Sequence, residues 1–278
     1  MFLRPTTLHE AVQVLAEGGQ VLAGGTDFFP ALGTRPAPPK IVDVSRVREL
    51  RGIQVERESI RMGGATTWSE IATAHLPRCF DALRAAAREI GAVQIQNRGT
   101  IAGNLCNASP AADGVPPLLI LDAEVELVSA SGVRRLPLCD FLTGNRKTQR
   151  RPDEILSSVI VPLTLRDAPS VFLKLGARRY LVISIAMVAA MIVDDGNGSV
   201  GAARISVGSC SATAQRLLKL ESDLVGQPLR SGLCSLVSTE HLAPLSPIDD
   251  VRATAAYRRD ATLTLVGRAI DRCVEVRA

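Results

Sequence analysis

Aromatic side chains are scarce in this sequence. Phe, Tyr and Trp make up 3% of the 278 residues, whereas hydrophobic residues of all kinds reach 46%. The cores must therefore be built from Ala, Val, Leu and Ile, and a surface that stacks RNA bases on exposed rings is not expected. The three histidines, His9, His75 and His241, stand far apart, so the sequence indicates no cluster of imidazoles for acid–base catalysis.

The cysteines lack the spacing of a metal site. The six of them are scattered and include no C-x-x-C pair. This pattern predicts free thiols in a reducing cytoplasm. A metal or iron–sulfur centre held by this chain alone is not expected, so any such cofactor would belong to a partner.

Long apolar runs are also missing. The longest, YLVISIAMVAAMIV at 180–193, is shorter than the roughly 20 residues that span a bilayer and is predicted to be a buried core element. The first residues, MFLRPTTLHEAV, lack the pattern of a secretory signal. We therefore expect a cytoplasmic protein without membrane insertion.

Positive charge is modest and dispersed. The formal net charge is +4, and the densest basic cluster is formed by Arg146, Lys147, Arg150 and Arg151, beside Pro152. A solvated loop or a contact with another subunit accounts for this cluster better than a nucleic-acid surface does. No nucleic-acid partner is expected.

Length and pattern predict three parts. The chain is longer than one core usually needs. Residues 1–52 are predicted to form a small α/β unit, and residues 53–168 a second unit that opens with a hairpin and closes with a strand at 153–162. Residues 169–278 contain candidate strands at 171–177, 184–193 and 200–207, with a hairpin turn DDGNGS before the last, and then become helical. Strands followed by helices indicate an α+β domain.

The first segment that could carry chemistry is LAGGTD at 22–27, which follows a predicted strand at 20–23. Adjacent glycines let backbone N–H groups approach a phosphate and permit the positive φ angles that turn successive amides toward one anion. Thr26 would add a hydroxyl donor. A tight turn between strand and helix, without any ligand, is the alternative.

The second segment is TIAGN at 100–104, just after Arg98 and Gly99. It is predicted to be another loop of small residues, and it too could be an ordinary turn. Neither segment ends in the Gly-Lys-Ser/Thr of a P-loop or forms G-x-G-x-x-G, which argues against kinases and nicotinamide dehydrogenases. Asp113 follows shortly, and its carboxylate would repel a phosphate but suits the hydroxyls of a ribose.

Together, LAGGTDFFPAL (22–32) and RGTIAGNLCNASPAADGVPPLLILDAEVEL (98–127) resemble the flavoprotein subunit of the xanthine dehydrogenase and carbon monoxide dehydrogenase family. DEILSSVIVP and FLKLGARRYLVISIAMVAA are similar to the same family, and the likeness runs to about residue 210. It implies an α+β protein: a two-subdomain FAD-binding fold of the vanillyl-alcohol-oxidase/PCMH type, followed by a C-terminal α+β domain of antiparallel strands and helices.

The resemblance also implies which residues bind FAD. Both segments would hold the pyrophosphate, Asp113 would hold the ribose, and Leu156 would lie in the adenine or flavin neighbourhood. Lys174 would place a cation near the flavin and so favour its negatively charged reduced form. The full set is Leu22, Ala23, Gly24, Gly25, Thr26, Asp27, Thr100, Ile101, Ala102, Gly103, Asn104, Asp113, Leu156 and Lys174.

In function, the resemblance implies an oxidoreductase subunit that passes electrons and does not itself hydroxylate a substrate. A large subunit would carry the molybdopterin-type molybdenum cofactor, and a small subunit with two [2Fe-2S] clusters would relay electrons to FAD in this chain. NAD, oxygen or another carrier would accept them. Such subunits form heterotrimers. The substrate and the terminal acceptor are not indicated.

Two details depart from the family, and two alternatives remain. Ala102 replaces one glycine of a usual pair, which binding should tolerate unless φ there is strongly positive. The role of Tyr180 is open. A free-standing flavin-dependent oxidase is one alternative, with Cys106 as the only candidate for covalent flavin attachment. An assembly subunit whose flavin site has decayed is the other.

Overall fold

The computed structural model describes residues 1–276. Packing divides the chain into two compact units whose segments alternate along the sequence. The first unit comprises 1–71, 92–108 and 122–163, and the second comprises 72–91, 109–121 and the chain from Thr164 onward. The division into 1–52, 53–168 and 169–278 that the sequence suggests stays a prediction.

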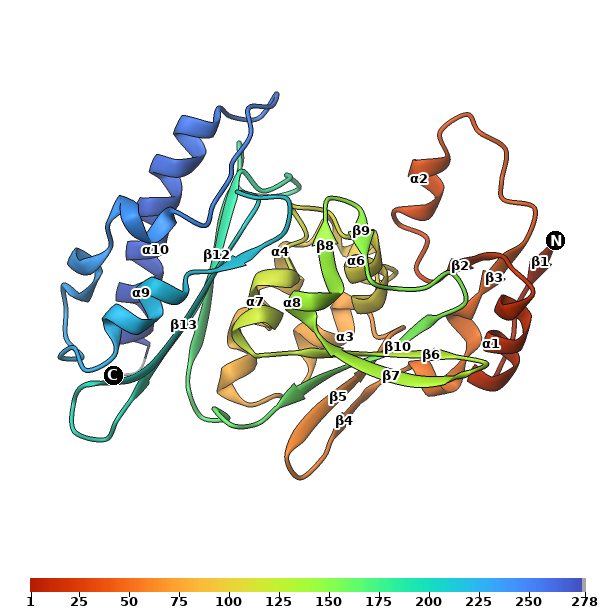
Figure 1. Cartoon of the computed structure of the whole chain (residues 1–278), viewed down its shortest axis with the longest axis horizontal. Coiled ribbons are helices and arrows are strands. Elements are labelled where there is room, and N and C mark those ends of the chain that lie inside the picture. Colours follow the sequence, from red (N-terminus) through yellow and green to blue (C-terminus); the bar gives the residue numbers. More distant parts are fainter. Residues whose placement is uncertain (277–278) are drawn as a thin grey trace. The chain divides into compact units, whose positions relative to one another are not determined.

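The first unit contains three sheets (Figure 1). They are a parallel sheet in the order β1-β3-β2, an antiparallel sheet in the order β4-β5-β10-β6-β7, and the small pair β8-β9. Its strands are β1 Phe2–Leu3, β2 Gln20–Leu22, β3 Ile41–Asp43, β4 Ile53–Val55, β5 Ser59–Gly63, β6 Glu124–Ser129, β7 Gly132–Pro137, β8 Leu142–Gly144, β9 Lys147–Thr148 and β10 Ile155–Pro162. Its helices are α1 Leu8–Ala16, α2 Phe28–Leu32, η1 Val44–Arg46, η2 Arg48–Leu50, α3 Trp68–Thr73 (whose last two residues belong to the second unit), α5 Val93–Gln96, α6 Ile101–Asn107 and α8 Leu138–Phe141.

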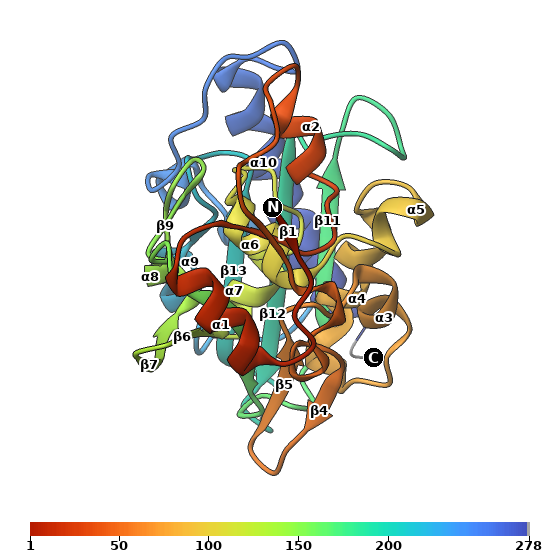
Figure 2. The same cartoon turned by 90° about the vertical axis from the view of Figure 1, so that its right-hand side faces the viewer.

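Two helices of this unit begin at residues whose side chains cap them. Thr7 caps α1 by accepting a hydrogen bond from the Glu10 amide. Before α3, Thr67 and Glu70 form a capping box, each side chain accepting from the other residue's backbone N–H. In contrast, α2 has no buried residue and extends away from α1 and the parallel sheet (Figure 2). The hairpin β4–β5 and the apolar strand β10 confirm two predictions.

The second unit is built on one antiparallel sheet, in the order β11-β12-β13-β14. Helices α9 and α10 pack against one face, and α4 and α7 against the other (Figure 1). Its strands are β11 Ser170–Leu175, β12 Ala186–Asp194, β13 Val200–Gly208 and β14 Gln215–Arg216. Its helices are η3 Arg78–Phe80, α4 Asp81–Glu89, α7 Val115–Ile120, α9 Leu218–Leu224, η4 Leu233–Leu236, η5 Thr239–Leu242 and α10 Ala255–Glu275. The predicted α+β class, with strands before helices, is confirmed.

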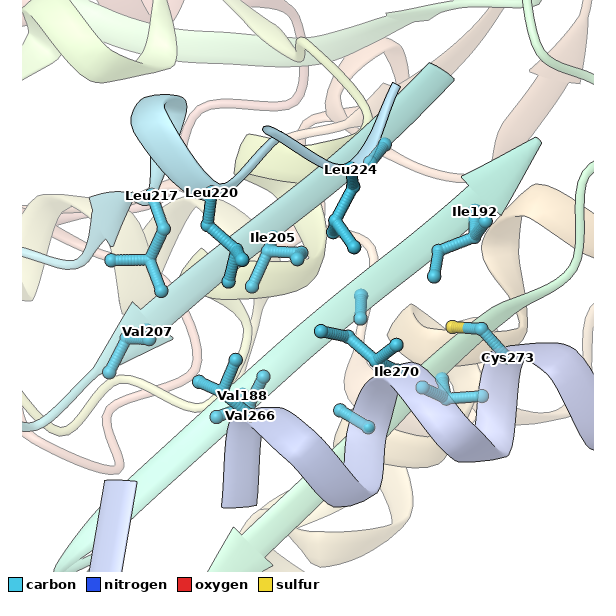
Figure 3. Packing of buried hydrophobic residues seen from close by; sticks show 14 of the residues in the cluster. Val188, Ile192, Ile205, Val207, Leu217, Leu220, Leu224, Val266, Ile270 and Cys273 are labelled. Carbon is cyan, nitrogen blue, oxygen red and sulfur yellow. The ribbon is translucent and has the colours of Figure 1, made fainter. Parts of the chain in front are cut away.

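The core of the second unit lies between its sheet and the helices α9 and α10 (Figure 3). Val188 of β12 and Ile205 of β13 face Leu220 of α9 and Ile270 of α10 across this layer. Residues 186–192 of β12 are all buried, because helices cover both faces of the sheet. An uninterrupted apolar strand is what two covered faces require.

The structure corrects two details. The apolar run at 180–193 is a buried core element only in its second part, because Tyr180 is 59%, Leu181 53% and Ile183 52% exposed in the turn before β12. The basic cluster is not wholly a loop, since Lys147–Thr148 forms strand β9 and pairs with β8. In both places the chain is near a tight turn, with Leu181 at φ +52° and Arg146 at φ +59°, and hydrophobicity or charge alone does not reveal such turns.

Candidate functional site

The first glycine segment leaves β2 and packs directly against Arg98 and Gly99, the two residues before the second segment. A methyl group on Gly24 would lie 1.9 Å from the carbonyl oxygen of Arg98. No side-chain carbon fits at that distance, so the contact between the segment and the Arg98 carbonyl requires a glycine at position 24. The structure therefore brings the two predicted segments together within the first unit.

The same segment offers unpaired donors. Three backbone N–H groups, those of Gly25, Thr26 and Asp27, have no acceptor within residues 1–276. The hydroxyl of Thr26 also has no hydrogen-bond partner among these residues. Gly25 has φ +78°, a conformation that glycine adopts without strain. Gly25 and Thr26 are partly exposed. Several unpaired donors in one accessible turn form a suitable site for an anion such as a pyrophosphate.

The second segment is not the loop that the sequence suggests. Thr100 is the N-cap of α6, and its hydroxyl accepts from the amide of Gly103 at 3.1 Å. The amides of Ile101 and Ala102 donate to the carbonyl oxygens of Thr66 and Gly64. The Thr-x-x-Gly spacing suits an N-cap as well as a loop. The first-turn donors of α6 are thus used inside the protein.

One polar group of α6 is left over. The side-chain oxygen of Asn104 is buried and accepts no hydrogen bond from any described residue. A buried acceptor without a donor costs free energy unless water or a ligand supplies the donor. Asn104 therefore presents a free acceptor within α6.

A third glycine contact, not foreseen from the sequence, supports α6. A methyl group on Gly64 would lie 2.2 Å from the carbonyl oxygen of Leu156 and 3.1 Å from the Cβ atom of Ala102. The adjacent glycines at 63 and 64 could have indicated it. Leu156 itself is buried in β10. Ala102 is not among the residues with positive φ, so its methyl group causes no backbone strain there.

Two predicted residues of the second unit form a buried ion pair. The ammonium of Lys174, on β11, lies 2.6 Å from one carboxylate oxygen of Asp113, and both side chains are less than a tenth exposed. The hydroxyl of Ser184 donates to the other oxygen of Asp113, also at 2.6 Å. Sequence reasoning missed Ser184, because it belongs to no motif.

Burial and the neighbouring donors have opposite effects on the pKa of the Asp113 carboxyl. Burial raises the pKa of the Asp113 carboxyl, while the charge and hydrogen bond of Lys174 and the hydrogen bond of Ser184 act to lower it. Lys174 also donates to the carbonyl oxygen of Glu89, at the end of α4. Among the described residues the ammonium has no third acceptor, and Lys174 lines a cleft of about 560 Å³ with Phe172, Glu89 and Arg178. Its remaining proton is available to a ligand.

The two residues left open by the sequence have simple surroundings. Tyr180 is exposed, and the guanidinium of Arg179 lies over its ring at 5.2 Å. Cys106, in α6, forms no disulfide, and burial raises the pKa of its thiol to about 11. A thiol with such a pKa is a poor nucleophile at neutral pH, which disfavours covalent flavin attachment there. No helix within residues 1–276 has the length and hydropathy of a membrane span.

Two family descriptions match this chain over nearly its whole length. Residues 1–164 match the FAD binding domain in molybdopterin dehydrogenase, and residues 172–273 match the CO dehydrogenase flavoprotein C-terminal domain. The xanthine dehydrogenase FAD-binding subunit of Escherichia coli O157:H7 is 34% identical over 281 residues, covering 98% of this chain and 94% of that protein. The nicotinate dehydrogenase FAD-subunit of Eubacterium barkeri is 34% identical over 237 residues, covering 82% and 80%.

Solved structures agree with these matches. Quinoline 2-oxidoreductase from Pseudomonas putida 86 superposes with a TM-score of 0.92 at 25% identity, covering 99% of this chain and 96% of that one. Carbon monoxide dehydrogenase from Hydrogenophaga pseudoflava gives 0.90 at 25% identity, covering 100% and 97%. The fold and the matches define an FAD-binding subunit of an oxidoreductase. The chain belongs to the FAD-binding (medium) subunits of the molybdenum hydroxylase family, which confirms the resemblance seen in its sequence.

Proposed function

We propose that this chain binds FAD through its first glycine segment and transfers electrons within a molybdenum hydroxylase complex. The bound FAD would supply the redox chemistry that joins single-electron carriers to a two-electron acceptor. The electrons would come from [2Fe-2S] clusters of a small partner subunit, after a large subunit with the molybdenum cofactor has oxidised the substrate. NAD is the first candidate for the terminal acceptor.

The contact between Gly24 and the Arg98 carbonyl is the observation that carries this proposal. It holds the first segment against Arg98 and Gly99, directly before the second segment, and the free amides of residues 25–27 supply hydrogen-bond donors at this place. Those donors fit a pyrophosphate, and the residues present are therefore suited to FAD. The names of the relatives, which include xanthine and nicotinate dehydrogenase subunits, support the wider role.

The remaining predicted residues have assigned roles in the proposal. Ala23 and Thr26 would help to hold the pyrophosphate, and Leu156 would support the cofactor through its place beside Ala102. Asp113 would accept a ribose hydroxyl with a lone pair that Lys174 and Ser184 leave free. Lys174 would donate a third hydrogen bond to the flavin and stabilise negative charge there.

Gly24→Ala in the full chain is the direct test. The added methyl group would force Gly24 and Arg98 apart, so we expect FAD affinity, measured by fluorescence titration, to fall at least a hundredfold. Gly144→Ala is the matched control, because its methyl group would meet only Lys147 side-chain atoms at 3.8 Å and its φ is not positive. FAD binding by Gly24→Ala equal to that of wild type would remove the glycine segment from the site.

The wider role needs a separate measurement. We expect the purified chain, or the chain copurified with its partners, to release one FAD on heating, identified by chromatography. A protein that stays colourless and cannot be reconstituted with FAD, even with its partners present, would overturn electron transfer and favour the alternative of a decayed assembly subunit. Oxidation of a substrate by the FAD-loaded chain alone, without an iron–sulfur or molybdenum partner, would instead favour a free-standing oxidase.

A further inference from the structure

Ser184 is the one member of the buried charge network that no motif identifies. Its side chain is 2% exposed, and its hydroxyl donates to the oxygen of Asp113 that faces away from Lys174. Asp113 thus lies between a neutral donor and a charged one, each at 2.6 Å. A buried carboxylate stays ionised only when such donors compensate for lost hydration.

The chain fixes Ser184 in this place from both sides. Directly after it, the amide of Ile185 donates to the carbonyl oxygen of Leu175, next to Lys174 in β11, at 2.7 Å. Before it, the turn at 177–183 closes on itself, because the Arg178 guanidinium donates to the Leu181 carbonyl oxygen. Gly176 makes room for Val182, whose methyl carbon lies 2.4 Å from where a Cβ atom at Gly176 would be. Ser184 therefore has a defined position relative to both Asp113 and β11.

Ser184 matters because Asp113 and Lys174 nearly cancel each other's charge. While Asp113 is ionised, the pair presents little net charge to the cleft that Lys174 lines. If Asp113 took up a proton, the positive charge of Lys174 would be uncompensated in a buried site, where charges interact strongly. The protonation of Asp113 therefore sets the field beside any ligand in the cleft.

We propose that Ser184 is a positioning residue that keeps Asp113 ionised and thereby sets the net charge that Lys174 presents to bound flavin. The second half of this inference depends on the proposed function, in which the flavin lies near Lys174; the first half does not. Ser184 itself acts only through Asp113.

The other charged groups near the pair do not replace Ser184. From α4, Glu89 contributes its backbone carbonyl oxygen to Lys174, and its side chain lines the cleft. Arg178 and Arg179 line the cleft as well, but one guanidinium is bound to the Leu181 carbonyl and the other lies over Tyr180. Lys174 and Ser184 are the groups that act on the Asp113 carboxyl.

The first experiment uses the full chain without FAD. Burial already raises the folded-state pKa of Asp113, and Ser184→Ala should raise it further. A carboxyl with a raised folded pKa lowers stability as the pH increases from its unfolded pKa through its folded one. The penalty of Ser184→Ala should thus be smallest near pH 4 and grow toward pH 8, by about tenfold in the unfolding constant for each unit of added shift.

Two companion variants make this result specific. Ser184→Thr keeps the hydroxyl and should restore the wild-type pH profile. In an Asp113→Asn background, Ser184→Ala should have the same effect at every pH, because no carboxyl remains. A penalty of Ser184→Ala that is equal at pH 4 and pH 8 in the Asp113 background would show that the hydroxyl only fills space, and would overturn the inference.

The second experiment measures the midpoint potential of bound FAD against pH. At pH values where Asp113 is protonated in Ser184→Ala but ionised in wild type, the charge of Lys174 is uncompensated in the variant. The equilibrium between oxidised and reduced flavin should then shift up to tenfold toward the reduced form, which is about 30 mV for two electrons. The two proteins should converge at high pH. Potentials that coincide at all pH values would refute the link from Ser184 to the flavin. Failure of wild type to bind FAD would refute the proposed function instead, while the FAD-free stability profile would still decide the role of Ser184.

Discussion

The first glycine segment and the Asp113–Lys174 pair differ in whether their polar groups are free or already paired within the protein. Around Gly24 the chain removes side chains and leaves backbone donors unpaired and accessible. At Asp113 it buries two charges and saturates most of their hydrogen bonds with each other and with Ser184. The first region gains by being open to a ligand, whereas the second has a fixed internal structure before any ligand is present. Binding energy and electrostatic tuning are thus carried by different kinds of groups.

The largest expected effect is the loss of stability when the buried Asp113–Lys174 ion pair is broken. Lys174→Met leaves the Asp113 carboxylate buried without its cation, so we expect a loss of about 3–5 kcal/mol in the free energy of unfolding at pH 8. Urea denaturation of the full chain measures it. Lys219→Met removes an exposed pairing with Asp223 and should have a far smaller effect, because water screens the two charges. Equal effects of the two variants would mean that the Asp113 pair behaves as a surface pair.

A carboxylate of the first unit should show the opposite pH response. Burial alone would raise the pKa of Glu126, but hydrogen bonds from Arg61, Ser157 and Arg135 outweigh it and lower the pKa to about 2. Its stabilising effect is therefore complete above the ordinary value near 4.5 and is lost as the pH falls through about 2. Glu126→Gln should cost about 1.5–3 kcal/mol at pH 7 and progressively less below pH 4.5.

Glu124→Gln, two residues earlier on the same strand, is the control, because within residues 1–276 its side chain has no partner. Thermal melts of both variants between pH 3 and pH 7 would compare them. A penalty for Glu126→Gln that does not change over this range would show that its hydrogen bonds do not depend on its charge.

The smallest expected effect concerns a single donor in the open region. Thr26→Val removes a hydroxyl that has no partner among the described residues, so the melting temperature of the FAD-free chain should not change. FAD affinity should fall about fivefold, as expected for one neutral hydrogen bond of about 1 kcal/mol. Thr143→Val, on the exposed part of β8, should alter neither quantity. An unchanged FAD affinity in Thr26→Val would leave binding to the backbone donors alone.

Elements whose causes are local can be predicted from local sequence signals. The Thr7 cap, the capping box at Thr67 and Glu70, and the turn between β12 and β13 all depend on residues within a few positions of one another. The glycine segment after β2 belongs to the same group. In these places the sequence and the fold agree because the stabilising partners are neighbours in the chain.

Contacts between distant residues could not be predicted in this way. The carbonyl oxygen that Gly64 accommodates belongs to Leu156, and the carboxylate that Ser184 binds belongs to Asp113, 71 residues away. Thr100 is ambiguous even locally, because the same residues suit a loop and a helix start. Which of these forms depends on the carbonyl oxygens of Thr66 and Gly64, which accept from the Ile101 and Ala102 amides, and only the folded chain supplies those acceptors.

The position of α10 in the sequence has a consequence for how the protein is made. The strands β12 and β13 are translated long before the helix that covers them, because β12 ends at Asp194 and α10 begins at Ala255. At roughly 5–20 residues per second, the ribosome needs several seconds to add the intervening chain. During that time the Val188 and Ile192 side chains lack the α10 residues of their cluster, among them Val266 and Ile270 (Figure 3). We therefore expect one face of this sheet to stay partly uncovered in the nascent chain until α10 has been synthesised.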